Sequence, residues 1–161
     1  IIATGARSRE LPNLRQDGMK IIGYREAMNL PSLPASMVVV GSGAIGSEFA
    51  GFYRAMGTEV TLVEFMPRVL PIEDEEVSRT LERAFKKAKM KIMVNSTVEK
   101  VDTSGEKCIV TIKTPKGEET VETEIVLSAV GITPNIEGIG LEEAGVKTDR
   151  GRVVVDEFYR T

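Results

Sequence analysis

The stretch Met37–Glu64, MVVVGSGAIGSEFAGFYRAMGTEVTLVE, decides the fold of this chain. It begins with an apolar β-branched run, continues through a glycine-rich turn and a segment with apolar residues at helical spacing, and ends in a second apolar run. A continuous β-branched run is typical of a central parallel strand that is buried on both faces. The stretch therefore predicts a strand, a tight turn, an amphipathic helix and a second parallel strand that ends on the carboxylate of Glu64.

The predicted helix has an apolar face that should pack on the sheet. Its large apolar residues are spaced by 4, 3 and 4 positions, which places them on one side of a helix. Gly57 stands where a C-terminal cap is expected. The residues predicted to face the sheet are Ile45, Phe49, Phe52 and Met56.

The chain beyond Glu64 continues the α/β pattern and then departs from it. Acidic positions 73–76 and lysines within 86–89 flank a helical repeat of apolar residues, an arrangement that suits the helix dipole, and an apolar strand follows at 92–94. Residues 97–123 alternate in polarity, which predicts an antiparallel β-meander of three strands. The meander supplies the long connection to a further parallel strand at 125–130. The predicted fold class is α/β, a Rossmann-like parallel sheet with this meander as a crossover.

The two flanks are richer in loop-forming residues. Residues 11–36 contain proline, asparagine and glycine with a weak helical segment at 24–30, and apolar triplets at 1–3 and 153–155 are predicted to form strands. We predict three parts: a flank with a linker over 1–36, a central domain over 37–131, and a final segment over 132–161.

Composition limits the classes of function. The chain has 161 residues, 42% of them hydrophobic, enough for one sizeable core. Its net charge of −3, from 21 basic and 24 acidic residues, provides no cationic surface for nucleic acid, and no apolar run is long enough to cross a membrane. We therefore expect neither partner. The expected location is the cytoplasm, or the mitochondrial matrix in a eukaryote, and the first residue, Ile1, suggests a longer natural chain.

The cysteine and histidine content limits the chemistry further. The chain has one cysteine, Cys108, and no histidine. It can form neither an internal disulfide nor a Ser-His, Cys-His or His-metal site. We expect no metal site and no catalytic residue in this chain, and a buried structural role for Cys108.

The turn after the first strand matches the pattern G-x-G-x-x-G. Gly41 allows the tight turn, Gly43 lets the backbone approach a pyrophosphate without a Cβ in the way, and Gly46 lets the helix pack closely on the sheet. The helix start presents free N–H groups to the phosphates. Glu64, 18 residues beyond Gly46, is placed to accept hydrogen bonds from the adenosine ribose. The predicted ligand is NAD, and the turn consists of Gly41-Ser42-Gly43-Ala44-Ile45-Gly46.

Three further stretches accompany the glycine turn and Glu48: Ile2–Ala6 (IATGA), Val63–Pro71 (VEFMPRVLP) and Ala129–Asn135 (AVGITPN). Together they resemble the dihydrolipoyl dehydrogenases, which belong to the flavin-dependent pyridine nucleotide-disulfide oxidoreductases. The resemblance extends over essentially the whole chain. A meander in place of a crossover helix is what the NAD domain of that family has, within the FAD/NAD(P)-binding type of fold.

The resemblance implies roles for the matching residues. The turn Gly41–Gly46 would hold the NAD pyrophosphate, and Glu64 would hold the adenosine ribose. Val98 would lie against adenine. Gly131 would let the nicotinamide end approach closely, and Glu48 would lie near the nicotinamide.

The resemblance also implies a parent enzyme with parts that this chain lacks. In it, residues 1–36 would be a flanking piece of the FAD domain with a linker, 37–131 the NAD-binding domain, and 132–161 a segment returning toward the FAD domain. Thr4 and Gly5 would belong to the flavin domain and touch FAD, whereas Ile132 departs from the arginine often found after this glycine. In the family, electrons pass from dihydrolipoamide to a CxxxxC disulfide, then to FAD, then to NAD. The implied partners are the lipoyl domains of 2-oxo acid dehydrogenase complexes and the second subunit of a homodimer. With no cysteine pair, this chain is expected to bind NAD(H) and to be inactive by itself.

Two other interpretations remain open from the sequence. The chain could come from another disulfide reductase or an NADH oxidase, although the stretch from Glu64 to Pro71 favours the lipoamide enzyme. A stand-alone nucleotide-binding module without redox chemistry is the alternative from a different class.

Glu64 predicts that the chain prefers NADH to NADPH. A 2′-phosphate about 4 Å from the carboxylate would be repelled by roughly 4 kcal/mol at an effective dielectric constant near 20. This exceeds the ~1.5 to 3 kcal/mol that a charged hydrogen bond contributes. Calorimetric titration should give the lower dissociation constant for NADH, and tighter binding of NADPH would contradict the assignment.

Overall fold

The computed structural model describes residues 1–161, which divide into two compact units. The larger unit is Glu10–Gly131, and the smaller unit combines Ile1–Arg9 with Ile132–Thr161. The sequence led us to group residues 1–36 as one part, whereas the structure divides them between Arg9 and Glu10. Residues 10–36 belong to the larger unit because the short strand β2 (Ile21–Ile22) pairs with its sheet.

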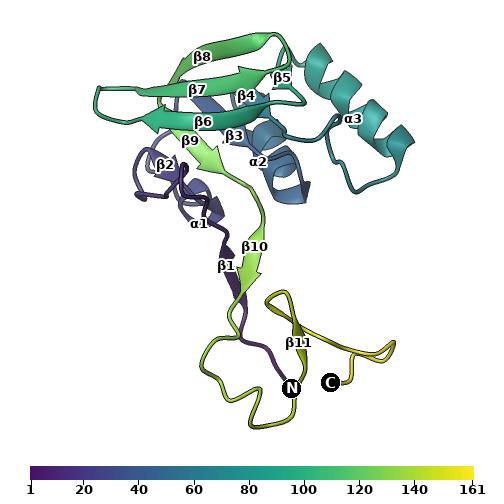
Figure 1. The fold of residues 1–161 in the computed structure, drawn as a ribbon. Helices are drawn as coiled ribbons and strands as arrows, with labels where there is room; N and C mark the ends of the chain where they lie inside the picture. The colour runs from purple at the N-terminus through teal and green to yellow at the C-terminus, as the bar shows by residue number, and fades with distance from the viewer. The chain divides into compact units, whose positions relative to one another are not determined.

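The larger unit is built on a five-stranded parallel sheet in the order β2-β9-β3-β4-β5 (Figure 1). All its neighbouring strands are parallel, as the sequence predicts for the apolar runs. The chain passes from β3 to β4 and β5 on one side and returns on the other side as β9. The strands other than β2 are β3 (Ser36–Val40), β4 (Glu59–Val63), β5 (Lys91–Met93) and β9 (Ile125–Ser128).

A three-stranded antiparallel sheet replaces the helix in the crossover from β5 to β9, which confirms the predicted meander. It consists of β6 (Thr97–Asp102), β7 (Cys108–Thr114) and β8 (Gly117–Thr123) in sequential order. The alternating pattern places Cys108, Val110 and Ile112 on the buried face of β7, where each is fully buried. The predicted structural role of Cys108 is confirmed, and burial raises the pKa of its thiol.

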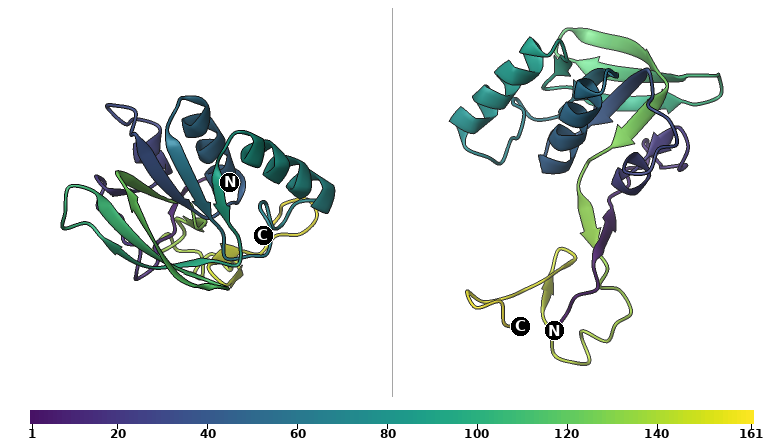
Figure 2. Two further views of the ribbon diagram at one scale, coloured as in Figure 1. Left: turned by 90° about the horizontal axis from the view of Figure 1, so that it is seen from above. Right: turned by 180° about the vertical axis from the view of Figure 1, so that it is seen from behind.

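The parallel sheet is covered on both faces. One hydrophobic cluster joins it to α1 (Tyr24–Ala27), α2 (Ala44–Ala55) and α3 (Glu75–Lys87), and a second cluster joins its other face to the meander. Figure 2 shows α2 and α3 on one side of the sheet and the meander on the other. This double burial explains why the strands read as continuous apolar runs.

The predicted sheet-facing residues of α2 are partly wrong. Phe52 and Met56 are each 56% exposed, and Ile45 and Phe49 are half-buried. The buried stripe is instead displaced by one residue, or about 100° around the helix. Small residues let this stripe approach the sheet backbone, and the Tyr53 hydroxyl donates to the carbonyl of Ala27. The buried residues are Gly46, Ser47, Ala50 and Tyr53.

The ends of α3 agree with the sequence, whereas its apolar repeat is only partly buried. The Asp74 carboxylate caps the helix by accepting from the N–H of Glu76 at 2.8 Å. Phe85 is buried, but Val77 is 52% exposed. Ser78 is buried in its place, because its hydroxyl donates to the carbonyl of Val69 in the preceding loop.

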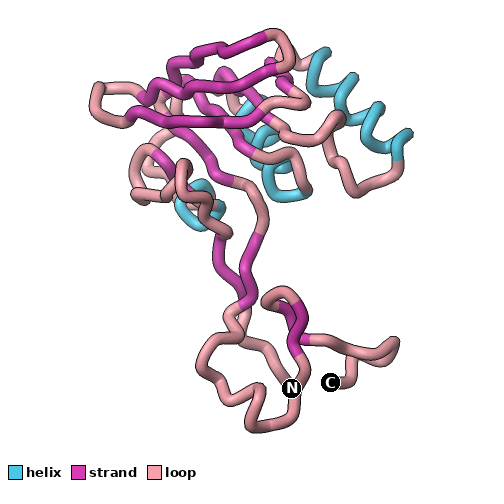
Figure 3. The backbone as a smooth tube through the Cα atoms, in the orientation of Figure 1, coloured by secondary structure: helices cyan, strands magenta, loops and turns pink.

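The smaller unit is mostly loop, with two short antiparallel pairs (Figure 3). The strand predicted at 1–3 is wrong, because residues 1–3 pair with no strand, and the strand predicted at 153–155 overlaps the observed one only at Val153. The observed pairs are β1 (Ala6–Ser8) with β10 (Ile132–Pro134), and β11 (Thr148–Asp149) with β12 (Arg152–Val153).

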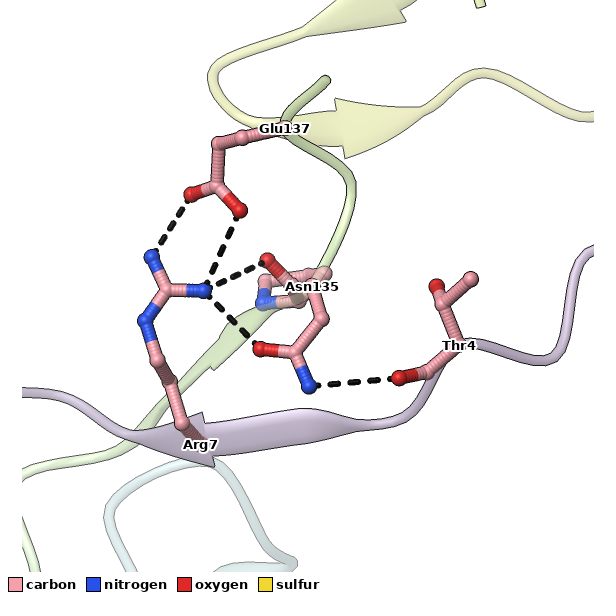
Figure 4. Close-up of polar contacts among 5 residues, drawn as sticks. Thr4, Arg7, Asn135 and Glu137 are labelled. Carbon is pink, nitrogen blue, oxygen red and sulfur yellow. Dashed lines mark hydrogen bonds and ion pairs between the residues drawn. The ribbon is translucent and has the colours of Figure 1, made fainter. Parts of the chain in front are cut away.

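Side-chain contacts of Arg7 reinforce the β1–β10 pair (Figure 4). The guanidinium of Arg7 forms a two-pronged ion pair with Glu137, with N–O distances of 2.6 and 3.2 Å, and also donates to the Asn135 side-chain oxygen at 2.9 Å. Chiefly through this hydrogen bonding, Arg7 lowers the pKa of the Glu137 carboxyl from 4.5 to about 2.

The Arg7–Glu137 ion pair should make an acid-sensitive contribution to the stability of the smaller unit. Because the folded-state pKa of Glu137 is depressed, the stabilisation is present above about pH 4.5 and is lost as pH falls toward 2. An NMR titration should place the Glu137 midpoint near pH 2, and Arg7→Ala should return it toward 4.5. Arg9→Ala removes a neighbouring arginine that does not contact Glu137 and should leave the midpoint unchanged. A midpoint near 4.5 in the unmodified chain would contradict the pairing.

Candidate functional site

The glycine turn lies at the carboxyl ends of the central strands, where the strand order reverses. The N–H of Gly41 donates to Val63 O, and the N–H of Ala129 donates to Val40 O, both at 2.8 Å. These bonds extend the pairing of β3 with β4 and with β9 just beyond the strand ends. In open α/β sheets, ligands bind outside the carboxyl ends of the strands at such a switch point.

Gly41 and Gly46 are required by the protein itself. Gly41 has φ +96°, and a Cβ there would lie 2.5 Å from the carbonyl oxygen of Ala129. A Cβ at Gly46 would lie 1.9 Å from the carbonyl oxygen of Gly41. The first turn of α2 therefore rests directly on the backbone of the glycine turn, in agreement with the roles predicted for these two residues.

Gly43 has no such internal reason to be glycine. Its φ of −63° is ordinary for any L-residue, and a Cβ there would meet no atom within 4 Å. The space beside Gly43 is thus open, and a side chain would fill it. This geometry fits a ligand that must approach the backbone closely.

The N-terminus of α2 offers hydrogen-bond donors to such a ligand. Gly43 is the N-cap, no side chain caps the helix, and its first turn contains no acidic residue. The unpaired N–H groups and the helix dipole favour an anion at this end. The N–H groups of Gly41 and Ser42 already have partners within the protein, so the available donors begin at Gly43.

The Glu64 carboxylate lies beside the turn and is tightly held. Glu64 follows β4 and is 6% exposed. Its Oε2 accepts hydrogen bonds from the N–H and the hydroxyl of Ser42, each at 2.7 Å, and its Oε1 accepts one from the N–H of Met66 at 2.8 Å. Donors to the ionised form offset the cost of burying a carboxylate.

Ser42 makes a contact within the protein that the sequence did not predict. It is fully buried, and its side chain points at Glu64 rather than at open space. Its carbonyl accepts hydrogen bonds from the Ser47 hydroxyl at 2.9 Å and the Leu70 N–H at 3.1 Å. Sequence reasoning missed the Ser42–Glu64 contact, because the two residues are 22 positions apart and the motif leaves its second position unspecified.

The other predicted NAD residues differ in their exposure. Ala44 and Glu48 of α2 are exposed, and Ile45 is half-buried. Gly131 has φ +110°, which by itself favours glycine, and a Cβ there would meet nothing within 4 Å. The side chain of Val98 is 4% exposed and packs in the core between sheet and meander, and its carbonyl accepts a hydrogen bond from the side-chain amide of Asn13 at 2.7 Å.

Thr4 and Gly5, the predicted flavin contacts, lie in the smaller unit. Gly5 has φ +73°. Asn135 fixes both residues: its side-chain amide donates to Thr4 O at 3.2 Å, and its N–H donates to Gly5 O at 3.0 Å (Figure 4 draws the first of these bonds). No cluster of histidine, cysteine, aspartate and glutamate residues could hold a metal ion.

The fold and the site together define a class of protein. A parallel sheet with a glycine turn at its switch point and a meander as crossover is the Rossmann-like α/β fold of FAD- and NAD-binding domains. More particularly, the chain belongs to the pyridine nucleotide-disulphide oxidoreductase family, whose sequence model matches residues 1–161. The family and fold class predicted from the sequence are thereby confirmed.

Individual relatives agree with this family. A dihydrolipoyl dehydrogenase from Rhizobium etli is 45% identical over 162 residues, covering 100% of this chain and 34% of the relative. The crystal structure of LpdA from Mycobacterium tuberculosis matches 98% of this chain with a TM-score of 0.86 at 36% identity, covering 34% of LpdA. The flavoprotein disulfide reductase RclA from Escherichia coli matches 96% of this chain with a TM-score of 0.80 at 25% identity, covering 35% of RclA.

The chain spans about a third of the length of these relatives. None of its helices is both long and apolar enough to traverse a bilayer.

Gly43 and Gly46, at the start of α2, should differ in how well they tolerate replacement by alanine. Gly46→Ala would drive a methyl group into the Gly41 carbonyl and should lower the free energy of unfolding by about 3 kcal/mol or more. Gly43→Ala enters open space and should cost no more than about 1 kcal/mol, the usual penalty of a poorer N-cap. Urea denaturation of both variants tests the contrast, which equal losses of stability would contradict.

Proposed function

We propose that the larger unit binds NAD(H), with the pyrophosphate at the glycine turn and the adenosine ribose at Glu64. The observation that carries the proposal is the open space at Gly43. Contacts within the protein explain why positions 41 and 46 are glycine. At Gly43 the protein itself gives no such reason, and a ligand that occupies the space of a side chain would supply one. The uncapped start of α2 supports a phosphate at the same place.

Each proposed contact has a distinct physical task. The N–H groups that begin at Gly43 bind the pyrophosphate without a basic side chain. Glu64 binds a ribose hydroxyl and disfavours a 2′-phosphate by charge repulsion. Glu48 and Gly131 are proposed to lie near the nicotinamide. Val98 is proposed to lie beside adenine, with its side chain buried in the core.

We further propose that the chain is part of a dihydrolipoyl dehydrogenase. In that reaction the dithiol of dihydrolipoamide is oxidised to a disulfide and NAD is reduced to NADH with release of one proton, FAD and a protein disulfide relaying the electrons. With one cysteine and no histidine, this chain would contribute neither the disulfide nor a histidine acid–base group. Its own task is to bind and orient NAD, with Thr4 and Gly5 contributing to a flavin site.

Sequence similarity supports this member of the family over other disulfide reductases. The Rhizobium etli dihydrolipoyl dehydrogenase is 45% identical to this chain, whereas RclA, with nearly the same fold, is 25% identical. As a dihydrolipoyl dehydrogenase, the whole protein would act on the lipoyl domains of 2-oxo acid dehydrogenase complexes and would form a homodimer. This chain's own residues would contribute only contacts to the cofactors.

Gly43→Val tests the proposed site. The valine side chain would occupy the place of the pyrophosphate, so calorimetry should record a loss of NADH affinity of about tenfold to 100-fold or more. The matched control is Gly105→Val, in the turn between β6 and β7, where a Cβ makes only an ordinary contact at 3.6 Å. Undiminished NADH affinity in Gly43→Val, with the fold intact by circular dichroism, would rule out the pyrophosphate assignment.

A further inference from the structure

Asn13 lies in the turn Leu11–Leu14 and reaches the start of the meander. The N–H of Leu14 donates to Leu11 O at 2.9 Å, which closes the turn, and the Leu14 side chain is buried. The side-chain amide of Asn13 donates to Val98 O at 2.7 Å and to Glu99 O at 3.3 Å. Asparagine is common in turns, but this side chain binds two carbonyls of β6, 85 and 86 positions away, rather than its own turn.

The two carbonyls that Asn13 binds lie at an irregular point of β6. The pairing of β6 with β7 shifts in register between Val98 and Lys100, so Glu99 is the additional residue of a β-bulge. The additional residue of a bulge is left unpaired in the ladder of hydrogen bonds. Asn13 supplies the missing donors at this point, and the same two bonds hold its own side chain in place.

These contacts also fix which way the amide of Asn13 is turned. A carbonyl oxygen can only accept, so the –NH2 group must face Val98 and Glu99, and the side-chain oxygen lies on the other branch of the amide. No hydrogen bond within the protein ends on that oxygen, and Asn13 is exposed. The turn therefore presents a fixed hydrogen-bond acceptor that a ligand beside Val98 can reach.

A short path joins this acceptor to the proposed ribose position. The N–H of Ser96 donates to the backbone carbonyl of Glu64 at 2.9 Å, and Val98 follows Ser96 by two residues. Two residues of extended chain cover about 7 Å. A base that is attached to a ribose at Glu64 and lies along this segment toward Val98 would have its far edge directed at Asn13.

We propose that the side-chain oxygen of Asn13 accepts a hydrogen bond from the 6-amino group of adenine and makes the site selective for an adenine dinucleotide. The proposal rests on the NAD(H) site proposed above, in which adenine lies beside Val98. Amide side chains suit adenine, because their oxygen accepts from its 6-amino group. Hypoxanthine has a carbonyl oxygen at that position, so two acceptors would face each other. Asn13 cannot turn its amide to donate without losing both carbonyls of β6.

Calorimetry on the full chain tests this selectivity with NADH and reduced nicotinamide hypoxanthine dinucleotide, which differ only in the base. The unmodified chain should bind NADH about tenfold or more tightly than the hypoxanthine coenzyme. In Asn13→Ala the affinity for NADH should fall about fivefold to tenfold, the usual effect of one hydrogen bond, and the affinity for the hypoxanthine coenzyme should stay within about twofold. The variant should thus bind the two coenzymes with nearly equal affinity.

Asn29→Ala is the matched control. Asn29 is also exposed, and its side-chain amide likewise donates to a backbone carbonyl, that of Arg25, at 2.9 Å. Its removal should leave the selectivity for NADH unchanged. If Asn13→Ala is unfolded by circular dichroism, Asn13→Ser keeps a residue that suits a turn, removes the amide oxygen and should lose the selectivity in the same way.

The outcomes separate this inference from the proposed function. If NADH binds but the unmodified chain binds both coenzymes equally, Asn13 does not recognise the base, while the NAD(H) site stands. Selectivity that persists in a folded Asn13 variant, or an equal loss of affinity for both coenzymes there, also overturns the inference alone. If NADH does not bind to the unmodified chain, the proposed function fails and the inference fails with it.

Discussion

The close approach of α2 to the end of β3 is the constraint on which the rest of the site depends. The helix starts so near the glycine turn that a single methyl group at Gly46 would collide with the Gly41 carbonyl. This contact fixes the direction of α2 and aims its N-terminus at the switch point between β3 and β9. The uncapped N–H groups, the open space at Gly43 and the position of Ser42 all follow from it.

The hydrogen bonds around Glu64 extend this constraint from the turn to the next strand. Ser42 is held by the turn on one side and holds the carboxylate on the other, so the glycine turn and the end of β4 behave as one rigid element. A buried carboxylate is tolerated because three donors surround it. A site that is organised before binding loses less conformational entropy when its ligand arrives.

The two units contrast in how they are stabilised. The larger unit has two hydrophobic clusters, one on each face of the parallel sheet. The smaller unit relies on two short antiparallel pairs and on the exposed Arg7–Glu137–Asn135 cluster, and Ile2, Val154 and Val155 remain exposed in it. Exposed ion pairs contribute little stability, so most of the order in this chain comes from the sheet and its two coverings.

The sequence by itself determined the parallel strands, the meander, the glycine turn and the acid after β4, because each depends on local periodicity or on the backbone freedom of glycine. It could not determine which side of α2 faces the sheet, since the large apolar residues suggested Phe52 and Met56, whereas close packing selects the small residues Gly46 and Ala50. It also misplaced the terminal strands, because each forms only where a partner is available: β1 pairs with β10, distant in sequence, and β12 pairs with the neighbouring β11. Only the tertiary structure decided that Ser42 is turned inward onto Glu64, because hydrogen bonds between residues far apart in the chain leave no periodic trace in the sequence.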